Sequence, residues 1–373
     1  MRNVQQSFGC LLAATILFMS PVLIGCGGDQ SQSSPQCFDE PRDSLLLDIT
    51  QKDIRETEEE SVTLVVYDAF LAPEGAFKKF YQDTGITVNV LTTADTGTMV
   101  SQASLTSGDP IGDVMFGVDN TFLCRALLNN IFIPYRPSTW DQLNDGLKLD
   151  PYERVTPVDY GDICINFWKD AVSDVPHSID DLRNQNFENT FVTQNPETSA
   201  PGMGLFLATI AFYGEDDWED FWADLRRNGL KVRSGWSESY YGDFVAGGGS
   251  RSIVTSYATS PVAEYIFSSE PLASPPTEVI VDSCFRSIEF AGILRGTNKP
   301  IASALLIDFL TSQYFQELLP ETNFVLPAND MAEIPEVFTE FLPKNLSPIS
   351  LNPAVIEENR NNWTERWTQI VLR

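Results

Sequence analysis

Val62-Thr63-Leu64-Val65-Val66-Tyr67 is an apolar and β-branched run that predicts a buried parallel strand. It ends at Asp68-Ala69-Phe70, and a helical pattern follows over residues 74–83. Second and third strands are predicted over 85–91 and 113–118. This strand–helix alternation predicts an α/β domain with a parallel sheet.

The second half of the chain repeats this organisation. Residues 155–167 are extended and predict a crossover into a second lobe. Beyond it, strands are predicted over 191–193 and 252–257, a long apolar helix over 203–213, and a return strand over 287–294. The roughly 310 residues that follow position 60 exceed what one core usually covers, so two domains are expected.

The N-terminus predicts export. Arg2 precedes an apolar run over about 11–24, which is too short to span a bilayer comfortably. The run ends in Leu23-Ile24-Gly25-Cys26, which resembles a bacterial lipobox. We therefore expect a signal peptide at 1–25, lipidation of Cys26 and a flexible tether at 26–60, which place the protein in the periplasm or at the cell surface, anchored by lipid only. An ordinary signal peptide with a chance cysteine is the alternative.

The charge balance is strongly acidic. The chain has 52 Asp and Glu against 24 Lys and Arg, a formal net charge of −28. This balance argues against nucleic acid and anionic lipid headgroups as partners, and it favours the approach of a cation. Adaptation to salt or a need for solubility explains the same balance without any ligand.

Four cysteines follow the expected signal peptide and Cys26. Cys37, Cys124, Cys164 and Cys284 allow three pairings outside the cytoplasm, and their wide spacing contains no CxxC signal for a metal. We hypothesise a Cys124–Cys284 bond, because Cys124 follows the third strand and Cys284 begins a return segment that would run antiparallel beside it.

Two polar aromatic motifs carry the prediction of a binding site. They are Gly235-Trp236-Ser237-Glu238-Ser239-Tyr240 and Ser256-Tyr257-Ala258-Thr259-Ser260-Pro261. Ring faces among hydroxyls suit a flat cation, which gains stacking and cation–π energy. A third motif, Thr198-Ser199-Ala200-Pro201-Gly202, opens a helix, where backbone N–H groups bind an anion or a hydroxyl, or simply receive a cap.

Three aspartates and the single histidine are the other candidate site residues. Asp95, Asp119 and Asp159 lie at strand ends or helix starts, where they accept hydrogen bonds from an amino-substituted ring or serve as caps. His177 is the only histidine and has no partner motif, so neither a catalytic triad nor a histidine metal site is expected.

These motifs resemble the thiamine-binding proteins of bacterial ABC transporters, within the type II periplasmic-binding fold. The order and spacing agree from about residue 62 to 373. The matching stretches are Tyr67-Asp68-Ala69-Phe70, Gly117-Val118-Asp119-Asn120, Asp159-Tyr160-Gly161, Thr198 to Leu205, the two aromatic motifs, and Trp363-Thr364-Glu365-Arg366-Trp367.

The resemblance implies two α/β lobes around a cleft, lobe 1 from 61–160 with 285–373 and lobe 2 from 161–284, joined by hinge crossovers. It implies a non-enzymatic receptor that binds thiamine or thiamine phosphate as ligand, without a cofactor or metal, and delivers it to an ABC permease and its ATPase. The ligand contacts carried over are Tyr67, Asp95, Thr96, Ser199, Ala200, Trp236, Tyr257, Ala258, Thr259 and Ser260.

One departure concerns an aromatic residue that the family often has two positions after Ser-Pro. Ala263 stands there, with Tyr265 as a substitute. The alternatives are a receptor for another organic cation or for ferric iron, an extracellular enzyme acting on a phosphorylated metabolite, and a structural surface lipoprotein.

Overall fold

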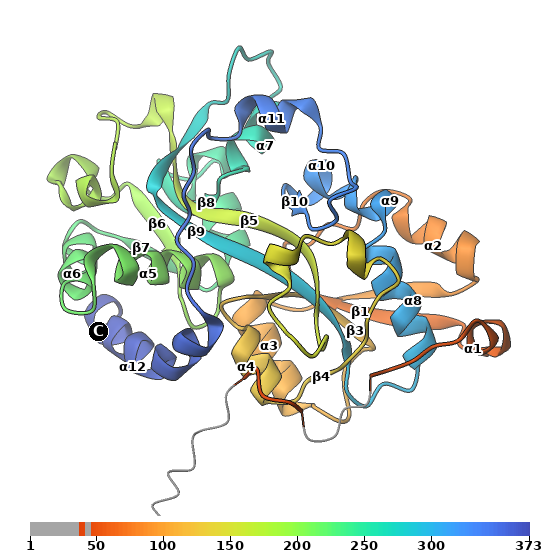
Figure 1. Cartoon of the computed structure of the whole chain (residues 1–373). Coiled ribbons are helices and arrows are strands. Elements are labelled where there is room, and N and C mark those ends of the chain that lie inside the picture. The colour runs from red at the N-terminus through yellow and green to blue at the C-terminus, as the bar shows by residue number, and fades with distance from the viewer. Residues whose placement is uncertain (1–36, 42–45) are drawn as a thin grey trace, which may run out of the picture. The chain divides into compact units, whose positions relative to one another are not determined.

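One mixed β-sheet organises the part of the chain that the computed structural model describes, residues 37–41 and 46–373 (Figure 1). Its strands are β1 (Ser61–Val66), β2 (Thr87–Thr92), β3 (Val114–Asp119), β4 (Phe132–Ile133), β5 (Thr156–Trp168), β6 (Phe191–Gln194), β7 (Lys231–Arg233), β8 (Ile253–Tyr257), β9 (Thr277–Leu294) and β10 (Leu326–Pro327). The order is β2-β1-β3-β9-β5-β8-β6-β7, with β10 beside β5 and β4 beside β9. The expected α/β fold is confirmed.

Two parallel groups of strands lie at opposite ends of this sheet. β1 pairs in parallel with β2 and β3, as the apolar run at 62–67 predicts, and β6 pairs in parallel with β7 and β8. Between them, β5 and β9 run antiparallel over almost their whole length, from Thr156 opposite Ala291 to Trp168 opposite Thr277. These two long strands therefore join the halves of the sheet (Figure 1).

Helices follow the strands on both sides of the sheet. They are α1 (Gln51–Glu56), α2 (Ala76–Thr84), α3 (Thr96–Leu105), α4 (Leu123–Leu128), α5 (Ala200–Tyr213), α6 (Trp218–Arg227), α7 (Ser260–Ile266), α8 (Pro300–Leu310), α9 (Gln313–Gln316), α10 (Leu319–Asn323), α11 (Glu336–Phe341) and α12 (Pro353–Val371). From β1 to β3 the chain alternates between strands and helices, as predicted. Two parallel strands need a crossover connection, and a helix provides it.

The C-terminal helix α12 packs against the second half of the sheet through α6. Trp367 is buried with its ring 5.5 Å from that of Trp222, and Trp363 donates its indole hydrogen bond to Glu215 at 2.8 Å. Arg366 forms ion pairs with Glu215 and Glu219. The C-terminal aromatic motif thus holds two parts of the chain together and lies outside the ligand site described below.

The disulfide pairing differs from the hypothesised Cys124–Cys284 bond, which is wrong. The structure pairs Cys37 with Cys124 and Cys164 with Cys284. Cys284 lies on β9 beside β5, where the register sets Ile163 opposite Phe285, so Cys164 is within reach at a Cα–Cα distance of 4.3 Å. Cys124 belongs to α4, away from that part of β9.

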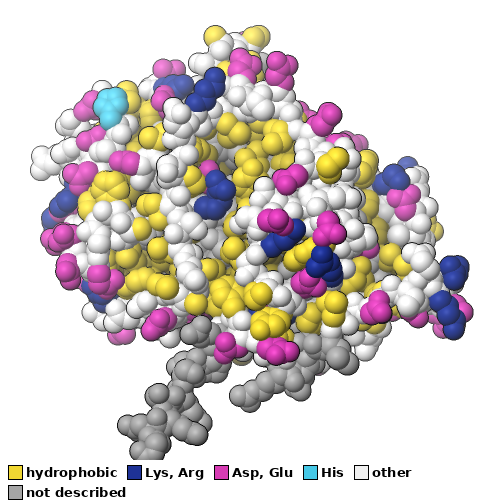
Figure 2. All heavy atoms as spheres, in the orientation of Figure 1, with side chains coloured by type: hydrophobic (Ala, Val, Ile, Leu, Met, Phe, Trp, Pro, Cys, Tyr) yellow, Lys and Arg dark blue, Asp and Glu magenta, His cyan; other side chains and the backbone are white. Residues whose placement is uncertain are grey.

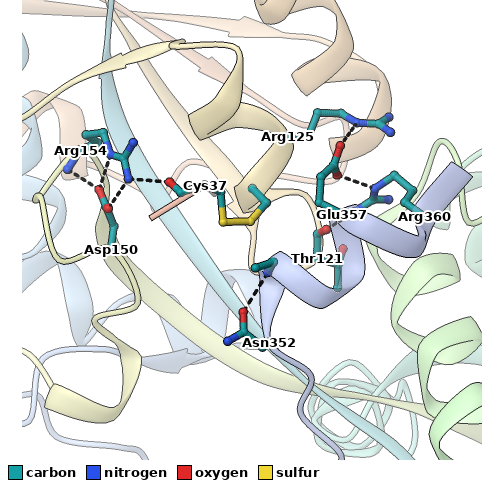
Figure 3. The surroundings of a disulfide bond; sticks show 10 residues. Cys37, Thr121, Arg125, Asp150, Arg154, Asn352, Glu357 and Arg360 are labelled. Carbon is teal, nitrogen blue, oxygen red and sulfur yellow. Dashed lines mark hydrogen bonds and ion pairs between the residues drawn. A yellow bond between two sulfur atoms is a disulfide. The ribbon is translucent and has the colours of Figure 1, made fainter. Parts of the chain in front are cut away.

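The expected signal peptide, the expected lipidation site Cys26 and the first part of the expected tether lie outside the described residues. In the described part, Cys37 is buried, and its carbonyl accepts a hydrogen bond from Arg154, whose guanidinium also pairs with Asp150 (Figure 3). Further on, the Leu47 amide donates to the carbonyl of Pro134 at 2.9 Å. The disulfide and these hydrogen bonds fix residues near 37 and 47 to the protein body, which differs from a freely hanging tether.

Acidic and basic side chains are interspersed on the face of the molecule that Figure 2 shows. Figure 2 shows Asp and Glu side chains spread across the visible face, with Lys and Arg among them, and no single acidic patch dominates that view.

Among the described residues, no helix combines the length and the apolar character that crossing a membrane requires.

Candidate functional site

The candidate site lies where the carboxyl ends of both groups of parallel strands meet. Tyr67 follows β1 and Asp95 follows β2, while Trp236 follows β7 and Tyr257 ends β8. All four line one cavity of about 140 Å³, roughly ten times what a single water molecule needs. The crevice outside the carboxyl ends of the strands is where α/β sheets bind ligands, so this cavity suits a small organic molecule.

Two glycines make room for the tyrosines of the cavity. Gly117 has φ +104°, and a Cβ placed there would lie 2.2 Å from Cδ1 of Tyr67. A Cβ on Gly161 would lie 3.3 Å from Cδ1 of Tyr257. Both glycines belong to motifs singled out in the sequence, and the missing side chain lets a tyrosine ring approach the backbone closely.

The indole of Trp236 is positioned by a stacked ring and a hydrogen bond. Its ring stacks on Tyr240 at a centroid distance of 4.6 Å and an angle of 19°, and its Nε1 donates to the hydroxyl of Ser256 at 2.9 Å. Tyr240 lies in a short π-helix, η6 (Glu238–Asp243), and donates its hydroxyl to Glu264 at 2.6 Å. Part of the indole is therefore covered by protein, and the remainder faces the cavity.

Asp95 connects the two halves of the sheet. Its carboxylate caps α3 through the Thr96 amide at 2.7 Å and also accepts from the amides of Ala200 at 3.4 Å and Trp236 at 3.0 Å. Burial raises the pKa of Asp95 to about 6, although these hydrogen bonds favour the ionised form. Nearby, the Gly97 amide donates to the Thr198 carbonyl at 3.0 Å, a second link between the halves.

Three more acidic side chains lie beneath the cavity. The register places both Asp119 of β3 and Asp159 of β5 opposite Glu289 of β9. Burial raises the pKa of Asp119 to about 6, and burial together with the neighbouring Asp119 charge raises that of Glu289 to about 8. Burial and the charge of Glu289 raise the pKa of Asp159 well above its ordinary value. The neighbouring Tyr67 opposes part of this rise in the pKa of Glu289.

The Asp, Glu, Lys, Arg and His residues that line the cavity are, in the described part of the chain, all acidic. Its lining includes Asp68, Asp95, Glu264 and Glu289, and no Lys, Arg or His is among the described residues that line it. In the described ranges no group of three or more His, Cys, Asp or Glu side chains is placed to hold a metal ion. Acidic groups beside aromatic rings suit an organic cation.

The cavity brings together most residues that the sequence predicts as ligand contacts. The lining includes Tyr67, Asp95, Thr96, Ala200, Trp236, Tyr257, Thr259 and Ser260. Ser199 is fully buried as the N-cap of α5, and Ala258 is buried with its amide bonded to the carbonyl of Asp162, so neither lines the cavity.

Sequence reasoning missed other residues around the cavity: Phe267 and Phe324 add aromatic surface, and Glu289 adds a carboxyl group. Tyr240, the last residue of the predicted Gly235-Trp236 motif, also lines the cavity, and so does Tyr241 beside it. One feature of the sequence could have identified Glu289: it is the single acidic residue in the mainly apolar run at 287–294. Ala263 lines the cavity, whereas the expected substitute, Tyr265, packs on Phe341 at 4.5 Å.

This fold and this cavity define the class of two-lobed solute-binding proteins, which bind small molecules between two α/β halves. The chain belongs to the bacterial extracellular solute-binding protein family, whose model matches residues 109–351. The relatives described next are binding proteins and not enzymes, as the sequence predicts.

Comparison with known proteins gives the relationships within this class. The chain is 29% identical over 328 residues to a thiamine-binding periplasmic protein of Brucella abortus biovar 1 (strain 9-941), covering 84% of this chain and 93% of the relative. A solved periplasmic thiamin binding protein matches with a TM-score of 0.74 and 24% identity, over 88% of this chain and 100% of that one. The apo ferric ion-binding protein A of Pasteurella haemolytica shares the fold, with a TM-score of 0.67 and 16% identity over 83% and 98% of the two chains.

Proposed function

We propose that this protein is the receptor of a bacterial importer and binds thiamine or its phosphate esters. The observation that carries the proposal is the lining of the cavity, where Trp236 and Tyr257 stand beside the carboxyl groups of Asp95 and Glu289. Thiamine joins a cationic thiazolium ring to an amino-substituted pyrimidine. Aromatic faces and acidic groups complement both rings, and the Brucella relative is named for thiamine binding.

The rest of the receptor mechanism is part of the same proposal. Lobe 1 comprises residues 61–160 and 285–373, lobe 2 comprises 161–284, and β5 and β9 act as the hinge between them. The contacts of Asp95 with Ala200 and Trp236 cross between these lobes, so they form only when the lobes meet. A lipid on Cys26 would hold the protein at the membrane surface, where its closed form presents the ligand to an ABC permease and its ATPase.

Titration calorimetry of the purified protein, beginning after Cys26, tests the ligand assignment. The panel contains thiamine, thiamine monophosphate, choline as a non-aromatic cation, and ferric ion. We expect one thiamine-class molecule to bind per chain and choline to bind far more weakly, since it offers no ring to stack. Equal binding of choline, or binding of ferric ion alone, would contradict the proposal.

A further inference from the structure

Three neighbouring strands present a row of carboxyl groups on one face of the sheet. β9 lies between β3 and β5, and its Glu289 is in register with Asp119 on one side and Asp159 on the other. Residues directly opposite each other in neighbouring strands point to the same face. The three side chains are between 0% and 5% exposed, so the row is buried at the base of the cavity.

The members of this row differ in how their oxygens are satisfied. Asp119 accepts hydrogen bonds from the hydroxyl of Thr121 at 2.9 and 3.0 Å and from the amide of Phe122 at 3.2 Å. Within residues 37–41 and 46–373, neither carboxyl oxygen of Asp159 has a hydrogen-bond partner, and neither does Oε2 of Glu289. Asp119 therefore has a structural role, whereas Asp159 and Glu289 have carboxyl oxygens that can still accept hydrogen bonds.

Unsatisfied buried oxygens are costly. Leaving a polar group buried without a hydrogen bond destabilises a protein, so such atoms require an explanation. Glu289 lines the cavity, so a bound molecule can reach its carboxyl group. A ligand that donates hydrogen bonds there would remove this cost on binding.

The surroundings restrict which chemical group fits. Tyr67 and Tyr257 line the same cavity, so a flat ring edge has aromatic surfaces beside it. A carboxyl group offers two atoms side by side, one that accepts a hydrogen bond and, when protonated, one that donates. An amino group next to a ring nitrogen presents the complementary pair in the same plane, and such bidentate pairing adds specificity as well as affinity.

We propose that Glu289, supported by Asp159, is a specificity-determining residue that pairs with the amino group and adjacent ring nitrogen of the ligand's pyrimidine. This inference rests on the proposed function, because it assigns one ring of a thiamine-class ligand to one end of the cavity. The thiazolium ring then lies toward Trp236, where the stacking surface is.

A double comparison between protein and ligand tests the pairing. Calorimetry is performed with thiamine and with its analogue that has hydrogen in place of the pyrimidine amino group. The proteins are the wild type, Glu289→Met and the control Glu278→Met, which makes the same chemical change at an exposed position of β9. In the wild type and the control, loss of the amino group weakens binding by about 10–100-fold, the effect of losing a charge-assisted or bidentate pair.

Glu289→Met is expected to bind thiamine more weakly than the wild type. In this variant the affinities for thiamine and for the analogue without the amino group should differ by less than about 3-fold. An equal loss in the wild type and in Glu289→Met would place the amino group elsewhere and overturn the inference, while thiamine binding itself would still support the proposed function. If the wild type does not bind thiamine, both this inference and the proposed function are wrong. If Glu289→Met does not fold, Asp159→Asn is measured in the same way, and a reduced effect of the amino group is expected there too.

Discussion

Replacing Glu289 by Gln should remove much of the pH dependence of stability in the ligand-free protein. Burial raises the pKa of Glu289 from 4.5 to about 8, so the folded protein keeps a proton that the unfolded chain releases. Where the folded state binds more protons than the unfolded state, the free energy of unfolding falls as the pH rises. For Glu289 this window runs from the ordinary glutamate pKa up to about pH 8.

The size of the effect follows from one proton. A difference of one bound proton changes the free energy of unfolding by about 1.4 kcal/mol per pH unit. Between about pH 5 and pH 8, the wild type should therefore lose up to about 4 kcal/mol through Glu289 alone. Because Asp159 titrates together with Glu289, we expect Glu289→Gln to remove about 2–4 kcal/mol of this loss.

The assay is urea denaturation of ligand-free protein at pH 5 and pH 8 with the disulfides intact. Glutamine has the shape and neutrality of protonated glutamate, so the variant should match the wild type at pH 5 and exceed it at pH 8. Glu278→Gln, an exposed carboxylate on the same strand, serves as the control. Parallel pH profiles for the wild type and Glu289→Gln would refute the reasoning, because they would mean that Glu289 is ionised in the folded protein.

Two further predictions concern the ligand. Trp236→Ala should weaken thiamine binding, measured by calorimetry, by about 1–3 kcal/mol, because a stacking surface is lost. The free energy of unfolding should also fall, by a smaller amount, because the indole packs on Tyr240. Unchanged affinity with a large loss of stability would make Trp236 a core residue only. Solution scattering should give a smaller radius of gyration with saturating thiamine than without it, because contacts such as Asp95 with Trp236 close the lobes. An unchanged radius with confirmed binding would indicate a rigid site.

Local sequence patterns were sufficient for the parallel strands β1 to β3 and for the aromatic part of the candidate site, but they predicted β9 only over 287–294, whereas the strand covers Thr277–Leu294. The run at 62–67 is apolar on both faces, so it has to be covered on both sides, which a parallel sheet with helices provides. In α6, Trp218, Phe221 and Trp222 recur at helical spacing, and all three are buried as that spacing predicts. Trp236 and Tyr257 were found because aromatic residues among Gly and Ser have no local reason to be core.

Features that depend on contacts between distant segments could not be predicted in this way. The partner of Cys284 follows from the register of β9 against β5, which a one-residue slip would change. The same register places Asp119, Glu289 and Asp159 in one row, although 40 to 170 positions separate them in the chain. Sequence determined which residue types this protein has to bury and which it offers to a flat cation. Which carboxyl groups are buried side by side follows from the tertiary structure alone. Burial and proximity shift their pKa values and leave oxygens without partners, and both arise only when distant strands pair.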